Sequence, residues 1–201
     1  MQTIQNKVLS RIYGQKRGWV FTPAHFRDLG SDESIRKILQ ILCDRGHIRR
    51  LARGLYDYPQ QHPKLGDLLP TPDAIAQALA DKESSRLQAS GTYAANLLGL
   101  SEQVPAKVIF LTDASDRRVK VAKQEIILKR TTPRNMATAG RTSGLVVQAL
   151  RYLGQDNVDD AVIAKLRDRL SPADRKQLTK DIRYAPAWIG AIFRRLATDA
   201  E

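Results

Sequence analysis

The sequence predicts an α+β protein: an N-terminal winged helix-turn-helix domain, then a C-terminal mixed domain with a small sheet and several helices. Three observations lead to this prediction. An amphipathic segment over 31–45 runs into a short arginine-rich hairpin over 48–58. Strand-like segments over 108–130 follow, and four helical segments come after Pro133. Strands followed by a run of helices are typical of the α+β class.

The N-terminal elements follow one another in the order of a winged helix. Apolar residues one helical turn apart predict a first helix that ends near Gly14. Trp19-Val20-Phe21 is a short strand-like run, and Thr22-Pro23 suits the start of a short helix over 24–29. Gly30-Ser31 then provides the turn and the N-cap of the next helix. A hairpin completes the order.

The helix over 31–45 is amphipathic. Its apolar residues recur at helical spacing and form one stripe: Ile35, Ile38, Leu39 and Leu42. The opposite face is polar, as expected for a helix that packs on one side only. Gly46 suits the C-terminal end, because glycine readily takes the left-handed conformation. Two short strands then flank a turn at 52–54, with three arginines near that turn.

A polar helix face next to an arginine-rich hairpin is typical of a recognition helix and its wing, so we expect this domain to bind DNA. Lysine, arginine and glutamine on the helix can bond base edges in the major groove, and wing arginines can reach phosphates. The residues expected to contact DNA are Lys16, Arg17, Ser34, Arg36, Lys37, Gln40, Arg49, Arg50 and Arg53. The alternatives are a small α+β domain whose helix only packs, and arginines that are only solvated surface charges.

Composition indicates the class of partner. The 201 residues carry a net charge of +12, with a pI of about 10.1, which favours a polyanionic partner. The start of the chain lacks the apolar core of a secretory signal, and the longest apolar run, 187–193, is far shorter than a membrane span. The single cysteine, Cys43, excludes an internal disulfide and is expected to be a packing residue. We therefore expect a cytoplasmic protein with no membrane partner.

The chain is predicted to divide at the segment 59–63. Prolines at both ends of these five residues oppose the continuation of a helix or strand. We expect a winged helix-turn-helix DNA-binding domain over 1–63 and an effector domain over 64–201. The first holds 11 basic and 5 acidic residues and the second 22 and 16, so the charge density of the first is about twice that of the second.

The C-terminal domain has its own sequence of elements. We expect helices over 71–82 and 93–98, a buried strand over 108–111, paired strands over 117–121 and 125–130, and helices over 142–153, 158–170, 172–182 and 186–196. Ser171-Pro172-Ala173-Asp174 is typical of a helix start, with a hydroxyl cap, proline at the first position and an acid in the first turn.

Basic residues concentrate between positions 117 and 134. The seven are Arg117, Arg118, Lys120, Lys123, Lys129, Arg130 and Arg134, accompanied by one acid, Glu125. Alternation in Arg118-Val119-Lys120-Val121 sends the charges to one face of a strand and the valines to the other. This pattern favours a second nucleic-acid surface that extends the DNA footprint or binds RNA. The alternative is a solvated hairpin.

Nothing in the sequence favours an enzyme. The histidines at 25, 47 and 62 lack metal-ligand spacing, and there are no paired cysteines and no phosphate-binding glycine loop. Asp113 and Asp116 follow a strand, where metal-binding carboxylates occur, but turn formation is the commoner role of aspartate there. We therefore expect no catalytic residue, no metal and no cofactor.

Several segments of the chain resemble the AbiEi-type antitoxins of type IV toxin–antitoxin systems. They are Gly46-x-Ile48-x-Arg50-x-x-Arg53-Gly54-Leu55-Tyr56, Ser90-Gly91 followed by 94–100, Pro105-x-Lys107 before a strand that ends Leu111-Thr112-Asp113, and Ala149-Leu150-x-Tyr152-Leu153-Gly154. The order of these segments is more specific than any one of them.

The resemblance implies a bacterial transcriptional regulator, active in phage defence, that represses its own operon by binding inverted repeats in double-stranded promoter DNA. It also implies that the second domain, as an antitoxin, counteracts a nucleotidyltransferase-type toxin encoded beside it. The alternatives are a DNA-binding regulator without a toxin partner and an antitoxin that sequesters the toxin directly. A neighbouring nucleotidyltransferase gene would exclude the first alternative, and co-purification with the toxin would favour the second.

Overall fold

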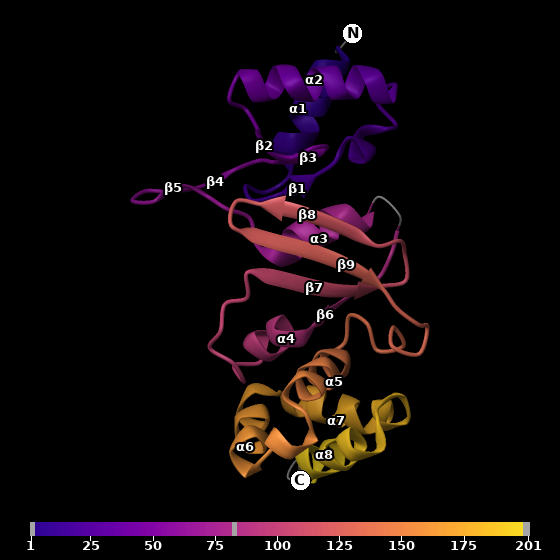
Figure 1. Cartoon of the computed structure of the whole chain (residues 1–201). Coiled ribbons are helices and arrows are strands. Elements are labelled where there is room, and N and C mark those ends of the chain that lie inside the picture. Colours follow the sequence, from indigo (N-terminus) through magenta and orange to yellow (C-terminus); the bar gives the residue numbers. More distant parts are fainter. Residues whose placement is uncertain (1–2, 82–83, 199–201) are drawn as a thin grey trace. The chain divides into compact units, whose positions relative to one another are not determined.

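The computed structural model describes residues 3–81 and 84–198, which fold into two compact units. The first unit comprises residues 1–85 and 119–123, and the second comprises residues 86–118 and 124–201. Both contain helices and sheets, and the order of elements confirms the predicted α+β class (Figure 1).

The first unit contains a winged helix. Its elements are α1 (Ile4–Gly14), β1 (Val20–Phe21), the 3-10 helix η1 (Pro23–Phe26), α2 (Asp32–Asp44), β2 (Arg49–Ala52) and β3 (Leu55–Asp57). The three strands form an antiparallel sheet in the order β1-β3-β2. The helix predicted over 24–29 is instead this 3-10 turn. Its first turn is closed by Thr22 and His25, whose side chain accepts from the Thr22 backbone N–H at 3.1 Å.

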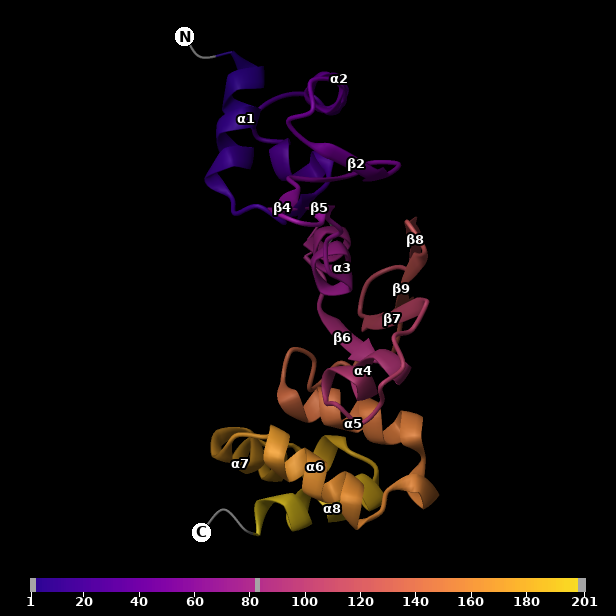
Figure 2. The ribbon, with the colours of Figure 1, turned by 90° about the vertical axis from the view of Figure 1, so that its left-hand side faces the viewer.

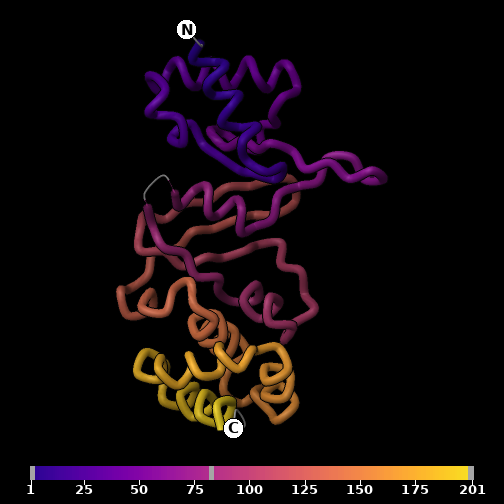
Figure 3. The backbone as a smooth tube through the Cα atoms, turned by 180° about the vertical axis from the view of Figure 1, so that it is seen from behind, coloured from indigo at the N-terminus to yellow at the C-terminus, as the bar shows by residue number. Residues whose placement is uncertain are grey.

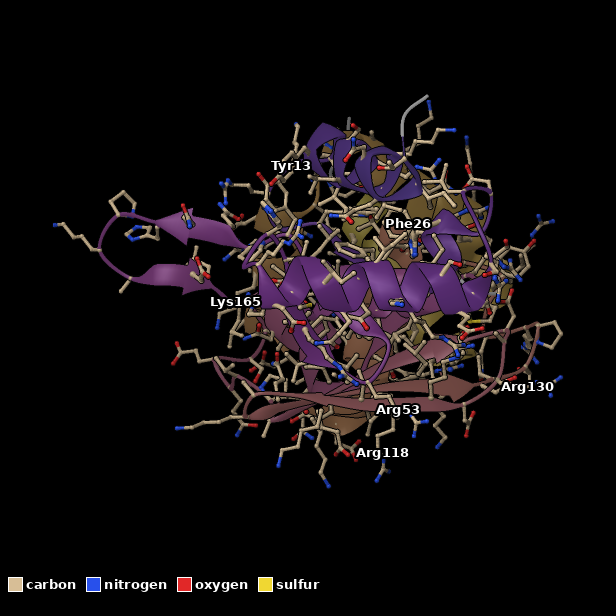
Figure 4. The ribbon with its side chains drawn as sticks, turned by 90° about the horizontal axis from the view of Figure 1, so that it is seen from above. Tyr13, Phe26, Arg53, Arg118, Arg130 and Lys165 are labelled. Carbon is tan, nitrogen blue, oxygen red and sulfur yellow. The ribbon has the colours of Figure 1, made fainter. Side chains whose placement is uncertain are left out.

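One apolar core joins the elements of the winged helix. Val8 of α1 and Leu39 of α2 are buried in it, together with aromatic residues from β1 and η1. Figure 4 shows Phe26 between α1 and α2. Ser31 caps α2, because its hydroxyl accepts a hydrogen bond from the Ser34 backbone N–H, and Gly46 follows the helix at φ 71°. The predicted amphipathic stripe therefore faces the core.

A hairpin and a helix follow the wing in the same unit: β4 (Gln60–His62), β5 (Gly66–Leu68) and α3 (Pro72–Asp81). The prolines at 59 and 63 were expected to prevent regular structure. They flank β4 rather than lie within it, so no backbone hydrogen bond of the β4–β5 ladder is lost. Position 63, the expected boundary, therefore lies in a hairpin turn of the first unit, and the predicted helix end at Lys82 lies outside the described residues.

A four-stranded mixed sheet and a short helix come next. The elements are β6 (Leu87–Ser90), α4 (Gly91–Leu97), β7 (Lys107–Thr112), β8 (Arg117–Val121) and β9 (Gln124–Arg130), with strand order β6-β7-β9-β8. They belong to the second unit except for residues 119–123, at the end of β8 and in the turn after it, which group with the first. β6 pairs with β7 antiparallel, and β7 pairs with β9 parallel. Strand β6 was not predicted, because two of its four residues are polar and its apolar signal is therefore short.

Four helices complete the second unit: α5 (Thr142–Leu153), α6 (Asp160–Arg169), α7 (Pro172–Asp181) and α8 (Ala187–Ala197). All four predicted helices are present, and their ends differ from the prediction by at most two residues. Figure 2 shows the four helices gathered together. Their apolar faces enclose a core that includes Leu150, Leu166 and Phe193. No helix within 3–81 or 84–198 has both the length and the apolar character needed to cross a membrane.

A buried carboxylate connects α5 and α7. Asp181 accepts hydrogen bonds from Arg141 at 2.7 Å, Ser143 at 2.5 Å and Gln177 at 3.0 Å. Burial raises the pKa of Asp181, but the hydrogen bonds from Ser143 and Gln177 and the charge of Arg141 outweigh it, so the pKa lies below its usual range. The carboxylate is therefore ionised and fully bonded near neutral pH.

Candidate nucleic-acid interface

Helix α2 presents a polar face to solvent. Its buried residues fix the rotation of the helix, and as a result Arg36, Lys37 and Gln40 are exposed. The Gln40 amide donates to Asp44 at 2.8 Å, and Arg36 lies 3.8 Å from Asp32 in an exposed pair that contributes little to stability. These side chains are held by weak local contacts that a bound ligand can replace. The expected base-reading residues thus share one solvent-facing surface.

The wing separates two neighbouring arginines by strand geometry. Successive side chains of a strand point to opposite faces, so Arg49 and Arg50 diverge. Arg50 lies opposite Tyr56 and is exposed, and Arg53 is exposed in the turn before Gly54, which takes φ 72°. Figure 4 shows Arg53 at the surface of the wing. The two arginines supply positive charge where a wing approaches a DNA backbone.

Arg49 makes internal contacts instead. Its guanidinium donates to both carboxylate oxygens of Asp57, at 3.1 and 2.6 Å, and to the Leu68 backbone carbonyl at 2.7 Å. Burial holds the pKa of the Asp57 carboxyl above its usual range, although the hydrogen bonds and the charge of Arg49 lower it. Arg49 therefore stabilises the wing, in contrast to the DNA contact expected from the sequence. The sequence held one signal for this internal contact: Asp57 is an acid between Tyr56 and Tyr58, where a buried carboxylate needs a cationic partner.

The two basic residues before β1 also differ. Lys16 is exposed, whereas the Arg17 guanidinium donates to the Pro59 carbonyl at 3.0 Å and lies 4.7 Å from the centre of the Tyr58 ring. Arg17 is also exposed, and since a guanidinium carries five N–H donors it can keep this hydrogen bond while it contacts a phosphate. Ser34, at the start of α2, accepts a hydrogen bond from Ser31 at 3.0 Å and remains exposed near the positive helix end.

Strands β8 and β9 carry the second set of basic residues. Arg118 and Lys120 are exposed, whereas Val119 is half-buried and Val121 buried, as the alternation predicts. Figure 4 shows Arg118 and Arg130 at the surface. Arg118 lies 3.3 Å from the carboxylate of Glu125, and Arg117 is half-buried. The other exposed members of the set are Lys123, Lys129, Arg130 and Arg134.

The two aspartates after β7 hold loop ends in place. Asp113 accepts from the Arg86 backbone N–H at 2.9 Å and from its guanidinium at 2.8 Å, which lowers the pKa of Asp113. Asp116 accepts from the Arg130 backbone N–H at 2.6 Å. Within the described ranges, no three His, Cys, Asp or Glu residues gather as metal ligands would. Cys43 packs half-buried against the winged-helix core, and burial raises the pKa of its thiol.

Comparison with known proteins gives a family and a similar solved structure. Residues 7–178 match the model of a family described as a family of unknown function, DUF6088. No curated protein matches the chain. The solved RV2827C protein from Mycobacterium tuberculosis is similar at 12% sequence identity with a TM-score of 0.49, over 100% of this chain and 78% of that chain.

The different contacts of Arg49 and Arg50 can be tested by stability measurements. We expect Arg49→Ala to lower the free energy of unfolding by about 2–4 kcal/mol, because it leaves the buried Asp57 carboxylate without its partner. The control Arg50→Ala removes an equal charge from the same strand and should change stability by less than about 0.5 kcal/mol. Urea unfolding followed by circular dichroism measures both. Equal losses in the two variants would contradict this assignment.

Proposed function

This chain belongs to the DUF6088 family of unknown function, and we propose that it is an antitoxin of a type IV toxin–antitoxin system that represses its own operon. The single observation that carries the DNA-binding part is the joint exposure, on one winged helix, of the polar face of α2 and the wing residues Arg50 and Arg53. In this proposal α2 enters the major groove and the wing contacts the adjacent backbone or minor groove.

The residues are assigned roles by their chemistry. Lys37 and Gln40 contact base edges, because glutamine pairs with adenine and lysine with guanine in the major groove. Arg50, Arg53 and Lys16 neutralise phosphates, with Arg36 and Ser34 at the edge of the same surface. Inverted repeats in the operator would place two copies of the chain on the DNA.

The antitoxin part rests on the resemblance to AbiEi-type proteins. In this proposal the second unit counteracts a nucleotidyltransferase-type toxin encoded beside the chain, without necessarily binding it, and the protein acts in the cytoplasm. A regulator without a toxin partner and an antitoxin that sequesters its toxin remain the competing proposals. We further propose that the chain is not an enzyme, since Asp113 and Asp116 are occupied by loop hydrogen bonds.

We also propose that the basic set on β8 and β9 is a second nucleic-acid surface that extends the DNA footprint or binds RNA. The exposed charges of Lys120 and Lys123, on and just after β8, support it. A lysine that neutralises a phosphate releases a counterion, so its contribution depends strongly on salt.

We expect the chain to prefer its own upstream DNA over scrambled DNA in a gel-shift titration. Replacing Lys37, Arg50 and Arg53 with alanine should weaken this binding by about 100-fold or more, because each lost contact costs roughly 1–3 kcal/mol. The matched control replaces three exposed lysines of the second unit, Lys165, Lys176 and Lys180, and should have little effect. Equal, salt-labile binding to both fragments would contradict specific repression.

The second surface predicts a change in salt dependence. We expect Lys120→Ala with Lys123→Ala to reduce the slope of log K against log salt by roughly 0.9 for each lost phosphate contact. The control pair Lys165→Ala with Lys176→Ala removes the same charge from α6 and α7. Identical slopes for the two double variants would overturn the proposed second surface. If the Lys120→Ala, Lys123→Ala variant binds RNA more weakly but binds DNA unchanged, RNA is the ligand of this surface.

The antitoxin role predicts a growth phenotype. Expression of the neighbouring nucleotidyltransferase should arrest growth, and co-expression of the full chain should restore it. The variant lacking Lys37, Arg50 and Arg53 should restore growth as well, because repression and neutralisation are separate in this proposal. A wild-type chain that fails to restore growth would contradict the role, and stable co-purification with the toxin would favour sequestration.

A further inference from the structure

The β4–β5 hairpin extends away from the rest of the first unit. We call residues Gln60–Leu68 the arm (Figures 1 and 3). All three residues of β4 are exposed, and in β5 only Leu68 is half-buried. Leu65 at the tip is 73% exposed. An isolated two-stranded hairpin is at best marginally stable in water. Contacts other than burial in an apolar core must therefore stabilise the arm.

The base of the arm is fixed to the winged helix. Arg49 of β2 donates to the Leu68 carbonyl at 2.7 Å, so the guanidinium that neutralises Asp57 also holds β5. On the other strand, Arg17 donates to the carbonyl of the buried Pro59 at 3.0 Å. Charged donors thus hold both ends of the arm to the winged helix, at Leu68 in β5 and at Pro59 just before β4. The arm has a defined direction relative to α2 and the wing.

The tip of the arm is held in one conformation. The His62 Nδ1 atom accepts hydrogen bonds from the backbone N–H groups of Lys64 and Leu65, at 3.2 and 3.3 Å. Gly66 closes the turn at φ 69°, which favours glycine. Since Nδ1 is the acceptor, the proton of the neutral ring lies on Nε2, which is left as a donor. These contacts fix the backbone of the tip at the two residues, Lys64 and Leu65, whose side chains are exposed there.

We propose that the arm binds the minor groove of DNA, next to the site that α2 occupies in the major groove. This inference rests on the proposed function. Gln60 and His62, two residues apart on one face of β4, offer donors to the acceptors that line the minor-groove floor. Lys64 contacts a phosphate, and Leu65 is the apolar wedge that minor-groove proteins insert between base steps.

The composition of the arm favours DNA over a second copy of the chain. A stable protein interface buries about 800 Å² on each partner, and the exposed apolar residues in and beside the arm are Leu65 and Leu69. Two copies that each carry +12 also repel. The one acid of the arm, Asp67, lies near Arg49, whose guanidinium pKa is raised mainly by its hydrogen bonds to Asp57 and to a smaller extent by Asp67. At the tip itself the charged residue is Lys64, and Asp67 lies at the base side of the turn on β5.

The test compares two exposed double variants of the full chain. Lys64→Ala with Leu65→Ser changes the tip, and the control Lys107→Ala with Val104→Ser removes the same charge and a similarly exposed apolar side chain from the second unit. Each is titrated on the upstream and scrambled fragments and footprinted with hydroxyl radicals. Sedimentation velocity reports the oligomeric state of the free protein.

We expect the tip variant to bind about 10-fold more weakly than the control and to lose one protected minor-groove block, with the remaining protections retained. Replacing A·T pairs in that block with I·C, which keeps the minor-groove pattern, should preserve the protection, and G·C should reduce it. Unchanged affinity and footprint would overturn the arm proposal. Weaker binding together with loss of a free dimer would overturn it in favour of a second copy.

Failure of the repressor proposal gives a different result. A wild-type chain that binds both fragments equally contradicts specific repression. The arm proposal is then tested by the ratio of the dissociation constants of the tip variant and the control, measured on both fragments. A ratio near one overturns the arm proposal in that case too.

Discussion

The Asp57 carboxylate is buried on β3, the central strand of the winged-helix sheet, and its burial depends on Arg49. An ionised carboxylate away from water is strongly unfavourable unless a cation and hydrogen bonds compensate for it. Arg49 lies directly opposite Asp57 in the β2–β3 register and donates to both of its oxygens. The same guanidinium reaches the Leu68 carbonyl. One cation therefore joins both wing strands to the arm.

This pairing also explains how the wing divides its arginines. The pleat of β2 turns Arg49 to the internal side and Arg50 to the exposed side. In α2 the corresponding division comes from helical period, because burial of Ile35, Leu39 and Leu42 requires Lys37 and Gln40 to face solvent. The candidate DNA surface is thus the part of each element that the core leaves uncovered.

The packing of the second unit depends on a close contact between α5 and β6 and on a second buried carboxylate, Asp181. A side chain at Gly144 would collide with the Thr138 backbone carbonyl and the Gln88 side chain, so glycine allows the start of α5 to pack next to β6. Asp181 accepts from donors on α7, at the start of α5 and just before it, which fixes the two helices against each other. Long-range polar contacts therefore order this unit, together with its apolar core.

Local patterns in the amino-acid sequence were enough to predict the winged-helix order, the four C-terminal helices and the polar face of α2. These features depend on spacings of one to four residues, which a chain carries locally. The parallel pairing of β7 with β9, strand β6, the arm and the internal contacts of Arg49 became evident only in the folded chain. Strand partners and the partner of a charge depend on register between distant segments, and neither periodicity nor residue type specifies that register.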